Sequence, residues 1–173
     1  PGTGKSLTAK AVAGTWRLPL LRLDMGMILG PYVGQSEENI RKAIKIAESI
    51  APSILWIDEL EKAFSGIGES GGGSSDVMKR IFGTFLTWMQ EKTKPVFVIA
   101  TANDISSMPP EFLRKGRFDE IFFVDLPKDN AKKEIIKIHL RKRKKENWYS
   151  YFEKYVTQLK GYCGADIESL VKE

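Results

Sequence analysis

The chain has 173 residues, of which 42% are hydrophobic and 28% charged, as in an ordinary globular protein. Its formal net charge is +5, and the whole excess lies in residues 127–173, which carry 12 Lys or Arg against 7 Asp or Glu. No apolar run is long enough for a transmembrane helix, no signal-peptide pattern is present, and the single cysteine, Cys163, excludes an internal disulfide and fits a reducing compartment.

The chain opens with a glycine-rich segment, residues 1–6, that matches the second half of the pattern G-x-x-x-x-G-K-[ST]. Glycines let backbone N–H groups surround phosphate oxygens, and the positive end of the following helix favours the same anion. Lys5 would reach the β- and γ-phosphates, and Ser6 would offer its hydroxyl to Mg²⁺. A surface glycine turn is the alternative. We expect the following residues to bind nucleotide: Gly2, Thr3, Gly4, Lys5, Ser6 and Leu7.

Short apolar runs alternate with helical patterns as far as residue 126. Nearly continuous apolar runs are typical of parallel strands that are covered on both faces. We expect strands at residues 20–23, 54–57, 96–100 and 121–124, and helices at residues 6–14, 37–50 and 76–91. The alternation predicts an α/β fold, a three-layer sandwich with a mostly parallel sheet. The glycines of residues 65–75 predict a flexible loop.

Two carboxylates, Asp58 and Glu59, follow the second expected strand directly. Ligands of open α/β sheets bind beyond the carboxyl ends of the strands, so this pair is expected beside the phosphate loop. Asp58 is suited to holding Mg²⁺, through water, and Glu59 to orienting and deprotonating an attacking water. The alternative is that the pair caps a helix.

After Pro127 the strand patterns stop, and we expect helices at residues 130–145, 148–160 and 165–172. This change places a domain boundary there, with an α/β core at residues 1–126 and a partial helical domain at residues 127–173. The basic run at residues 141–145 has two interpretations. It is either the solvated end of a helix, where cations suit the dipole, or a surface for nucleic acid or acidic lipid.

With the phosphate loop and the acidic pair placed, the chain resembles the AAA ATPases over essentially its whole length. Asn103 ends a strand as the family's sensor-1 residue does, and would orient the lytic water or contact the γ-phosphate. Residues 113–119 resemble the arginine-finger segment, in which Arg114 and Arg117 would face a neighbouring subunit's nucleotide. Guanidinium groups there neutralise charge on the transferred phosphoryl group. A solvated arginine pair is the alternative.

Three further segments match positions of the family. Tyr32, Val33 and Gly34 are similar to the pore loop of members that pull polypeptide through a ring, although Pro31 replaces the usual basic residue and Gln35 a common acidic one. Tyr32 packing against its own domain is the alternative. His139 matches a histidine by the ribose of the nucleotide. Gly164 and Ala165 resemble the sensor-2 segment that opens a helix of the lid domain.

The resemblance implies an ATPase that binds ATP with Mg²⁺ and works as a homo-oligomeric ring, a hexamer, on a protein substrate. A DNA-associated ATPase and a nucleotide-gated scaffold that does not hydrolyse ATP stay open as alternatives. Residues 20–25, 51–59 and 82–88 are further similar to AAA proteins encoded in cyanobacteria and in plastid genomes, which implies a cytoplasm or a plastid stroma. We expect the first strand of the family's sheet upstream of Pro1, and the last lid helices after residue 173.

Overall fold

The computed structural model describes residues 2–28, 34–64, 74–106, 108–114 and 116–172. The chain separates into two compact units. One unit is Ser6–Ile121, and the other is Phe122–Glu173 together with Pro1–Lys5. The domain boundary that we place after residue 126 stays a prediction.

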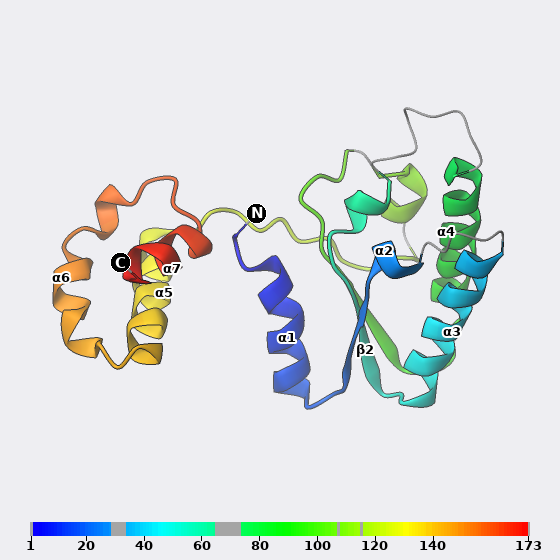
Figure 1. Ribbon diagram of the computed structural model, residues 1–173, viewed down its shortest axis with the longest axis horizontal. Coiled ribbons are helices and arrows are strands. Elements are labelled where there is room, and N and C mark those ends of the chain that lie inside the picture. Colours follow the sequence, from blue (N-terminus) through cyan, green and yellow to red (C-terminus); the bar gives the residue numbers. More distant parts are fainter. Residues whose placement is uncertain (1, 29–33, 65–73, 107, 115, 173) are drawn as a thin grey trace. The chain divides into compact units, whose positions relative to one another are not determined.

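A parallel three-stranded sheet forms the centre of the unit Ser6–Ile121 (Figure 1). Its strands are β1 (Leu20–Leu23), β2 (Ser53–Ile57) and β3 (Val96–Ala100), in that order across the sheet. The register pairs Leu23 with Ile57 and Ile57 with Ala100, so the carboxyl ends of all three strands are level. The predicted α/β fold class is confirmed, and the residues that follow the strands emerge at one edge of the sheet.

Helices cover both faces of this sheet (Figure 1). Helix α1 (Lys5–Trp16) lies on one face, and α3 (Gln35–Ser49) and α4 (Ser74–Glu91) lie on the other. Successive side chains of a strand point to opposite faces. Leu55 and Ile57 accordingly belong to the core beside α3 and α4, whereas the Trp56 ring lies 5.8 Å below the Lys10 ammonium of α1.

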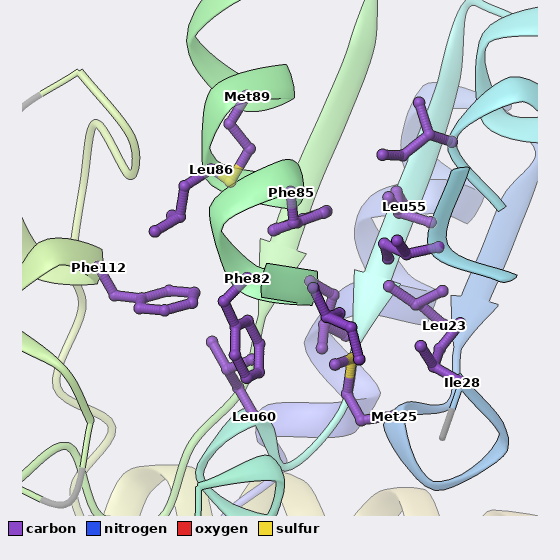
Figure 2. Packing of buried hydrophobic residues seen from close by; sticks show 14 of the residues in the cluster. Leu23, Met25, Ile28, Leu55, Leu60, Phe82, Phe85, Leu86, Met89 and Phe112 are labelled. Carbon is purple, nitrogen blue, oxygen red and sulfur yellow. The ribbon is translucent and has the colours of Figure 1, made fainter. Parts of the chain in front are cut away.

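The main core fills the space between the sheet and the helices α3 and α4 (Figure 2). Helix α4 directs a stripe of apolar side chains into it, at the three- and four-residue spacing of one helix face. An aromatic group closes one end: the rings of Phe64 and Phe82 stack at 4.2 Å, and Phe112 meets Phe82 edge-on at 5.0 Å. The stripe consists of Ile81, Phe82, Phe85, Leu86 and Met89.

A short helical element follows each strand. Helix α2 (Met25–Ile28) follows β1, and 3₁₀ turns η1 (Leu60–Ala63) and η2 (Pro110–Leu113) follow β2 and β3. The Asn39 side-chain amide of α3 donates to the carbonyl of Ile28 at 3.2 Å, which fixes the end of α2. Phe112 is 1% exposed and anchors η2 in the core.

The unit Phe122–Glu173 contains helices α5 (Asp129–Lys142), α6 (Tyr149–Glu153) and α7 (Gly164–Lys172), with 3₁₀ turns η3 (Glu146–Trp148) and η4 (Val156–Gln158). It has a small core of its own, made by Ile136, Leu140, Val156, Leu159, Ile167 and Val171. None of the helices in the described ranges is long and apolar enough to cross a bilayer.

The strand predicted at residues 121–124 is wrong. This segment has no regular secondary structure and belongs to no ladder of the described chain, and the side chains of Phe122 and Phe123 are 80% and 90% exposed. An apolar run in the sequence indicates only that its side chains favour a buried position. A strand also needs a neighbouring strand that exchanges backbone hydrogen bonds with it, and the described residues offer none here.

Two predicted helices end earlier or are broken. The helix predicted at residues 130–145 stops at Lys142, because Lys144 has a left-handed backbone (φ 56°) that no helix continues. The helix predicted at residues 148–160 is divided into α6 and short 3₁₀ turns, closed by i→i+3 bonds such as Tyr155 N–H to Phe152 O at 3.0 Å. The tighter turns let Phe152, Val156 and Leu159 all reach the small core.

We predict that Phe112→Ala lowers the free energy of unfolding by about 3–5 kcal/mol, because it leaves a cavity beside Phe64 and Phe82. Urea denaturation measures this change. Phe123→Ala is the matched control, since that ring is exposed and its loss should change the free energy by less than about 0.5 kcal/mol. Equal effects of the two substitutions would contradict the described core.

Candidate functional site

The carboxylate of Asp58 gathers polar groups at the carboxyl end of β2. The Ser6 hydroxyl, near the start of α1, donates to Asp58 Oδ1 at 2.8 Å, and the Thr101 hydroxyl donates to the same oxygen at 2.7 Å. On the other side, Arg22 Nη2 lies 3.4 Å from Asp58 Oδ2. These side chains come together because the carboxyl ends of the strands are level. Thr101 directly follows β3, and Arg22 lies on β1 beside Trp56.

These oxygens fit a magnesium ion. Mg²⁺ prefers hard oxygen ligands at 2.0–2.1 Å in an octahedron, so that neighbouring ligands lie about 2.9 Å apart. The Ser6 hydroxyl, 2.8 Å from Asp58 Oδ1, could take one of these positions, and Asp58 could hold the ion through a water ligand, as expected from the sequence. No three His, Cys, Asp or Glu side chains converge among the described residues, so water or phosphate would supply the remaining ligands, as is usual for Mg²⁺.

Glu59 follows Asp58 in a left-handed backbone conformation, with φ 51° and ψ 53°. This region costs energy for any residue with a Cβ and persists only where the surroundings fix it. Its carboxylate forms an ion pair with Lys62, and this pairing raises the pKa of the Lys62 ammonium. The predicted base therefore adjoins Asp58 in the chain, with a lysine as its present partner.

Thr101 fixes this turn, and the sequence analysis did not select it. Its hydroxyl accepts the Glu59 N–H at 3.2 Å while it donates to Asp58, and its carbonyl accepts the Leu60 N–H at 2.9 Å. The side chain is 7% exposed. The sequence shows a hydroxyl residue directly after the apolar strand Val96–Ala100. Which groups this hydroxyl can bond depends on the register between β2 and β3, which the sequence does not reveal.

Asn103, which the sequence analysis selected after the same strand, lies on the surface. Its side-chain amide donates to Glu61 Oε1 at 2.9 Å. Glu61 belongs to η1, the turn that begins after Glu59. The structure thus brings Asn103 to the turn that follows the acidic pair, and gives it no hydrogen bond to Asp58 or Glu59 within the described chain.

The two arginines proposed to act on a neighbour lie at the end of η2 and shortly after it. Arg114 is exposed just after η2. Arg117 is half-buried, and its Nη1 donates to the backbone carbonyl of Glu111. Its Nε is buried without a hydrogen-bond partner among the described residues. Neither guanidinium forms a hydrogen bond or an ion pair with Ser6, Asp58 or Glu59 in the described parts of this chain.

In the other unit, the start of the phosphate loop meets the start of α7. The Gly2 carbonyl accepts the Ala165 N–H at 3.2 Å. Gly2 has φ 77°, and a Cβ there would lie 2.5 Å from Cys163 Sγ, so only glycine fits. Asp166 caps α7 by accepting the Cys163 N–H at 2.8 Å. The fold thus brings Gly2 together with Ala165 and, through α7, with Gly164.

Three other predicted nucleotide residues have few polar partners. Lys5 Nζ lies 3.4 Å from the Thr3 hydroxyl, a weak contact that leaves the ammonium available. Leu7, in the first turn of α1, is exposed. The His139 Nδ1 on α5 is buried 4.0 Å from Glu168 Oε1. Burial lowers the pKa of this imidazole, and the Glu168 carboxylate opposes the shift.

Two predicted features cannot be placed. Tyr32 and Val33, the proposed pore-loop residues, lie outside the described residues, as do the glycines of residues 65–73. A surface hollow of about 570 Å³ lies elsewhere, between α3 and α4, where Arg41, Glu48 and Trp88 line it. None of the predicted site residues lines this open hollow, so we assign the chemistry to the carboxyl end of the sheet instead.

Comparison with known proteins gives one family and several relatives. The model of the ATPase family associated with various cellular activities (AAA) matches residues 1–126. An uncharacterized AAA domain-containing protein, ycf46, of Pyropia yezoensis is 54% identical over 99% of this chain and 35% of its own length. An ATP-dependent zinc metalloprotease FtsH of Acholeplasma laidlawii is 32% identical over 100% of this chain and 27% of its own.

A cell division cycle protein 48 homolog of Archaeoglobus fulgidus is 34% identical over 100% of this chain and 24% of its own length. The chain thus spans about a third of the ycf46 protein and about a quarter of the other two relatives.

We predict that Thr101→Val lowers the free energy of unfolding by about 1–3 kcal/mol, because the same-shaped side chain leaves the partly buried Glu59 N–H without its acceptor and removes a donor from Asp58. Thr101→Ser keeps the hydroxyl and should restore most of the loss. Thr93→Val, at an exposed position, is the matched control. Chemical denaturation compares the variants, and a neutral Thr101→Val would contradict the bridging role.

Proposed function

The chain belongs to the AAA family of ATPases, and from this premise we propose that it binds ATP with Mg²⁺ and hydrolyses it. One observation carries the proposal. The Ser6 hydroxyl of a phosphate-loop pattern lies 2.8 Å from the carboxylate that ends the central strand. Together these groups offer a metal position beside a loop suited to phosphates, at the edge of the sheet where α/β proteins bind ligands.

The nucleotide is held mainly by the phosphate loop in this proposal. Backbone N–H groups of residues 2–7 surround the phosphates, Lys5 adds a positive charge, and Ser6 and Asp58 hold the metal. Mg²⁺, when bound, offsets charge on the β- and γ-phosphates. We place Gly164, Ala165 and His139 near the nucleotide as well, and the bond between Ala165 and Gly2 supports this for the start of α7.

Glu59 activates the attacking water. The bond between the Glu59 N–H and the Thr101 hydroxyl fixes the backbone turn from which the Glu59 carboxylate extends. The present partner, Lys62, is exposed, and exposed ion pairs are weak in water, so Glu59 can exchange the lysine for a water molecule. Asn103 orients that water in this proposal, after leaving an equally exposed bond to Glu61.

Arg114 and Arg117 act on the nucleotide of a neighbouring copy, in a homo-oligomeric ring that we propose to be a hexamer. The exposure of Arg114 supports a role outside its own chain, as does the absence of any bond between either guanidinium and Asp58 in the described residues. We propose that the ring remodels a protein substrate, reached through Tyr32. The identity to the ycf46 protein and the single cysteine support a cytoplasm or a plastid stroma as its location.

We predict that Glu59→Gln lowers ATP turnover by at least about 100-fold and preserves ATP binding, because an amide cannot take the proton of the attacking water. Phosphate release measures turnover, and a titration with ATP measures binding. Gln keeps the size of the side chain and the backbone bond to Thr101. Unchanged turnover in this variant would exclude Glu59 as the base.

The shared active site is tested in the same assay by varying the protein concentration. Turnover per chain should rise with concentration, and Arg117→Ala should remove most of it at every concentration. Arg41→Ala removes an equal charge from an exposed position on α3 and serves as the matched control. Turnover that does not depend on concentration would contradict the ring, even if Glu59→Gln is inactive.

A further inference from the structure

Exposed cations adjoin exposed aromatic rings in the unit Phe122–Glu173. Residues 141–145 read Arg-Lys-Arg-Lys-Lys, and three outward rings follow closely in the chain. Trp148 is 53% exposed, Tyr151 55% and Tyr155 43%, which is high for side chains of this size. We call the set the basic–aromatic surface; it comprises Arg141, Lys142, Lys144, Lys145, Trp148, Tyr151 and Tyr155.

The cations of this surface are not neutralised by the fold. Arg143 is the exception in the run, since it donates to the His139 carbonyl at 2.9 Å and lies 3.7 Å from Glu168. The other members of the run are exposed, and in the part of the chain that the structure describes they form no ion pair. Arg141 and Lys142 lie in the last turn of α5, and Lys144 and Lys145 follow its end, so all four exposed charges can meet an anionic partner.

The aromatic residues divide into an inner and an outer set. Tyr149 and Phe152 pack against the small core of the unit, and Trp148, Tyr151 and Tyr155 point away from it. Tyr151 meets Trp148 at 79°, Phe152 at 90° and Tyr155 at 51°, so the rings form one cluster in which none is stacked in parallel on another. Because each outer ring keeps 43% or more of its surface exposed, part of it is available to another planar ring.

We propose that the basic–aromatic surface binds single-stranded nucleic acid, with the cations on phosphates and the rings stacked on bases. A duplex hides its bases in its own stack, so it would engage the cations alone. An anionic membrane would also attract the cations. However, residues 141–155 contain no aliphatic side chain that could enter the acyl region, and the neighbouring aliphatics Leu140 and Val156 are buried in the core.

The charge part of this inference is tested by fluorescence anisotropy, with the full chain and a fluorescein-labelled oligothymidylate of about 16 nucleotides. Lys144→Gln/Lys145→Gln should weaken binding at low salt about tenfold or more. It should also reduce the slope of log affinity against log salt by about 1.4, or 0.7 for each lost phosphate contact. Lys45→Gln/Lys94→Gln removes the same charge from exposed positions of the other unit and should change neither value.

The ring part is tested with Trp148→Ala and Tyr151→Ala, singly and together. Each should weaken binding about fivefold or more and leave the salt slope unchanged. Trp148→Phe and Tyr151→Phe keep a ring and should retain most of the affinity. Thermal unfolding verifies that each variant folds. If an alanine variant does not fold, the variant Lys144→Gln/Lys145→Gln still tests the inference, because both lysines are exposed. No nucleotide is needed, so the outcome is independent of ATP hydrolysis.

Several results would overturn the inference. They are an absence of oligothymidylate binding, an equal loss in the Lys45/Lys94 control, or competition by duplex DNA at equal strength. Tighter binding to phosphatidylglycerol vesicles than to the oligonucleotide, with the same dependence on Trp148 and Tyr151, would assign the surface to a membrane instead.

Discussion

A single buried hydroxyl holds the candidate site together. Thr101 donates to the Asp58 carboxylate and accepts the Glu59 N–H, so one side chain sets the direction of the proposed metal-binding carboxylate and the backbone of the residue beside it. This is possible because β2 and β3 are parallel and their ends are level. The left-handed backbone of Glu59 depends on this bond, since the conformation is unfavourable without support.

The packing of the sheet keeps these strand ends in place. Central β2 is buried along its whole length, with the α3–α4 core on one side and Trp56 under α1 on the other. Ser6 reaches Asp58 because α1 begins beside the same edge of the sheet. The preceding glycine, Gly2, is held in the other unit by the start of α7.

Much of the architecture followed from the sequence, and the failures have physical causes. Apolar runs located β1, β2 and β3, and the spacing between the phosphate loop and the acidic pair led to the AAA resemblance, which the family match and the 54% identity to ycf46 confirm. The strand predicted at residues 121–124 is wrong because the hydrophobicity of a segment does not show whether a neighbouring strand exists to pair with it. Thr101 was missed because a bridge between two strands is visible only once their register is known.

If Ser6 and Asp58 form the metal end of an ATP site, as we propose, calorimetric titration with ATP will detect it. Wild type and Asp58→Asn are compared in Mg²⁺ and in EDTA. We expect Mg²⁺ to strengthen ATP binding by wild type and to have little effect on Asp58→Asn, which keeps the side-chain shape but loses the charge. An equal response to Mg²⁺ in both proteins, or no binding by wild type, would contradict it.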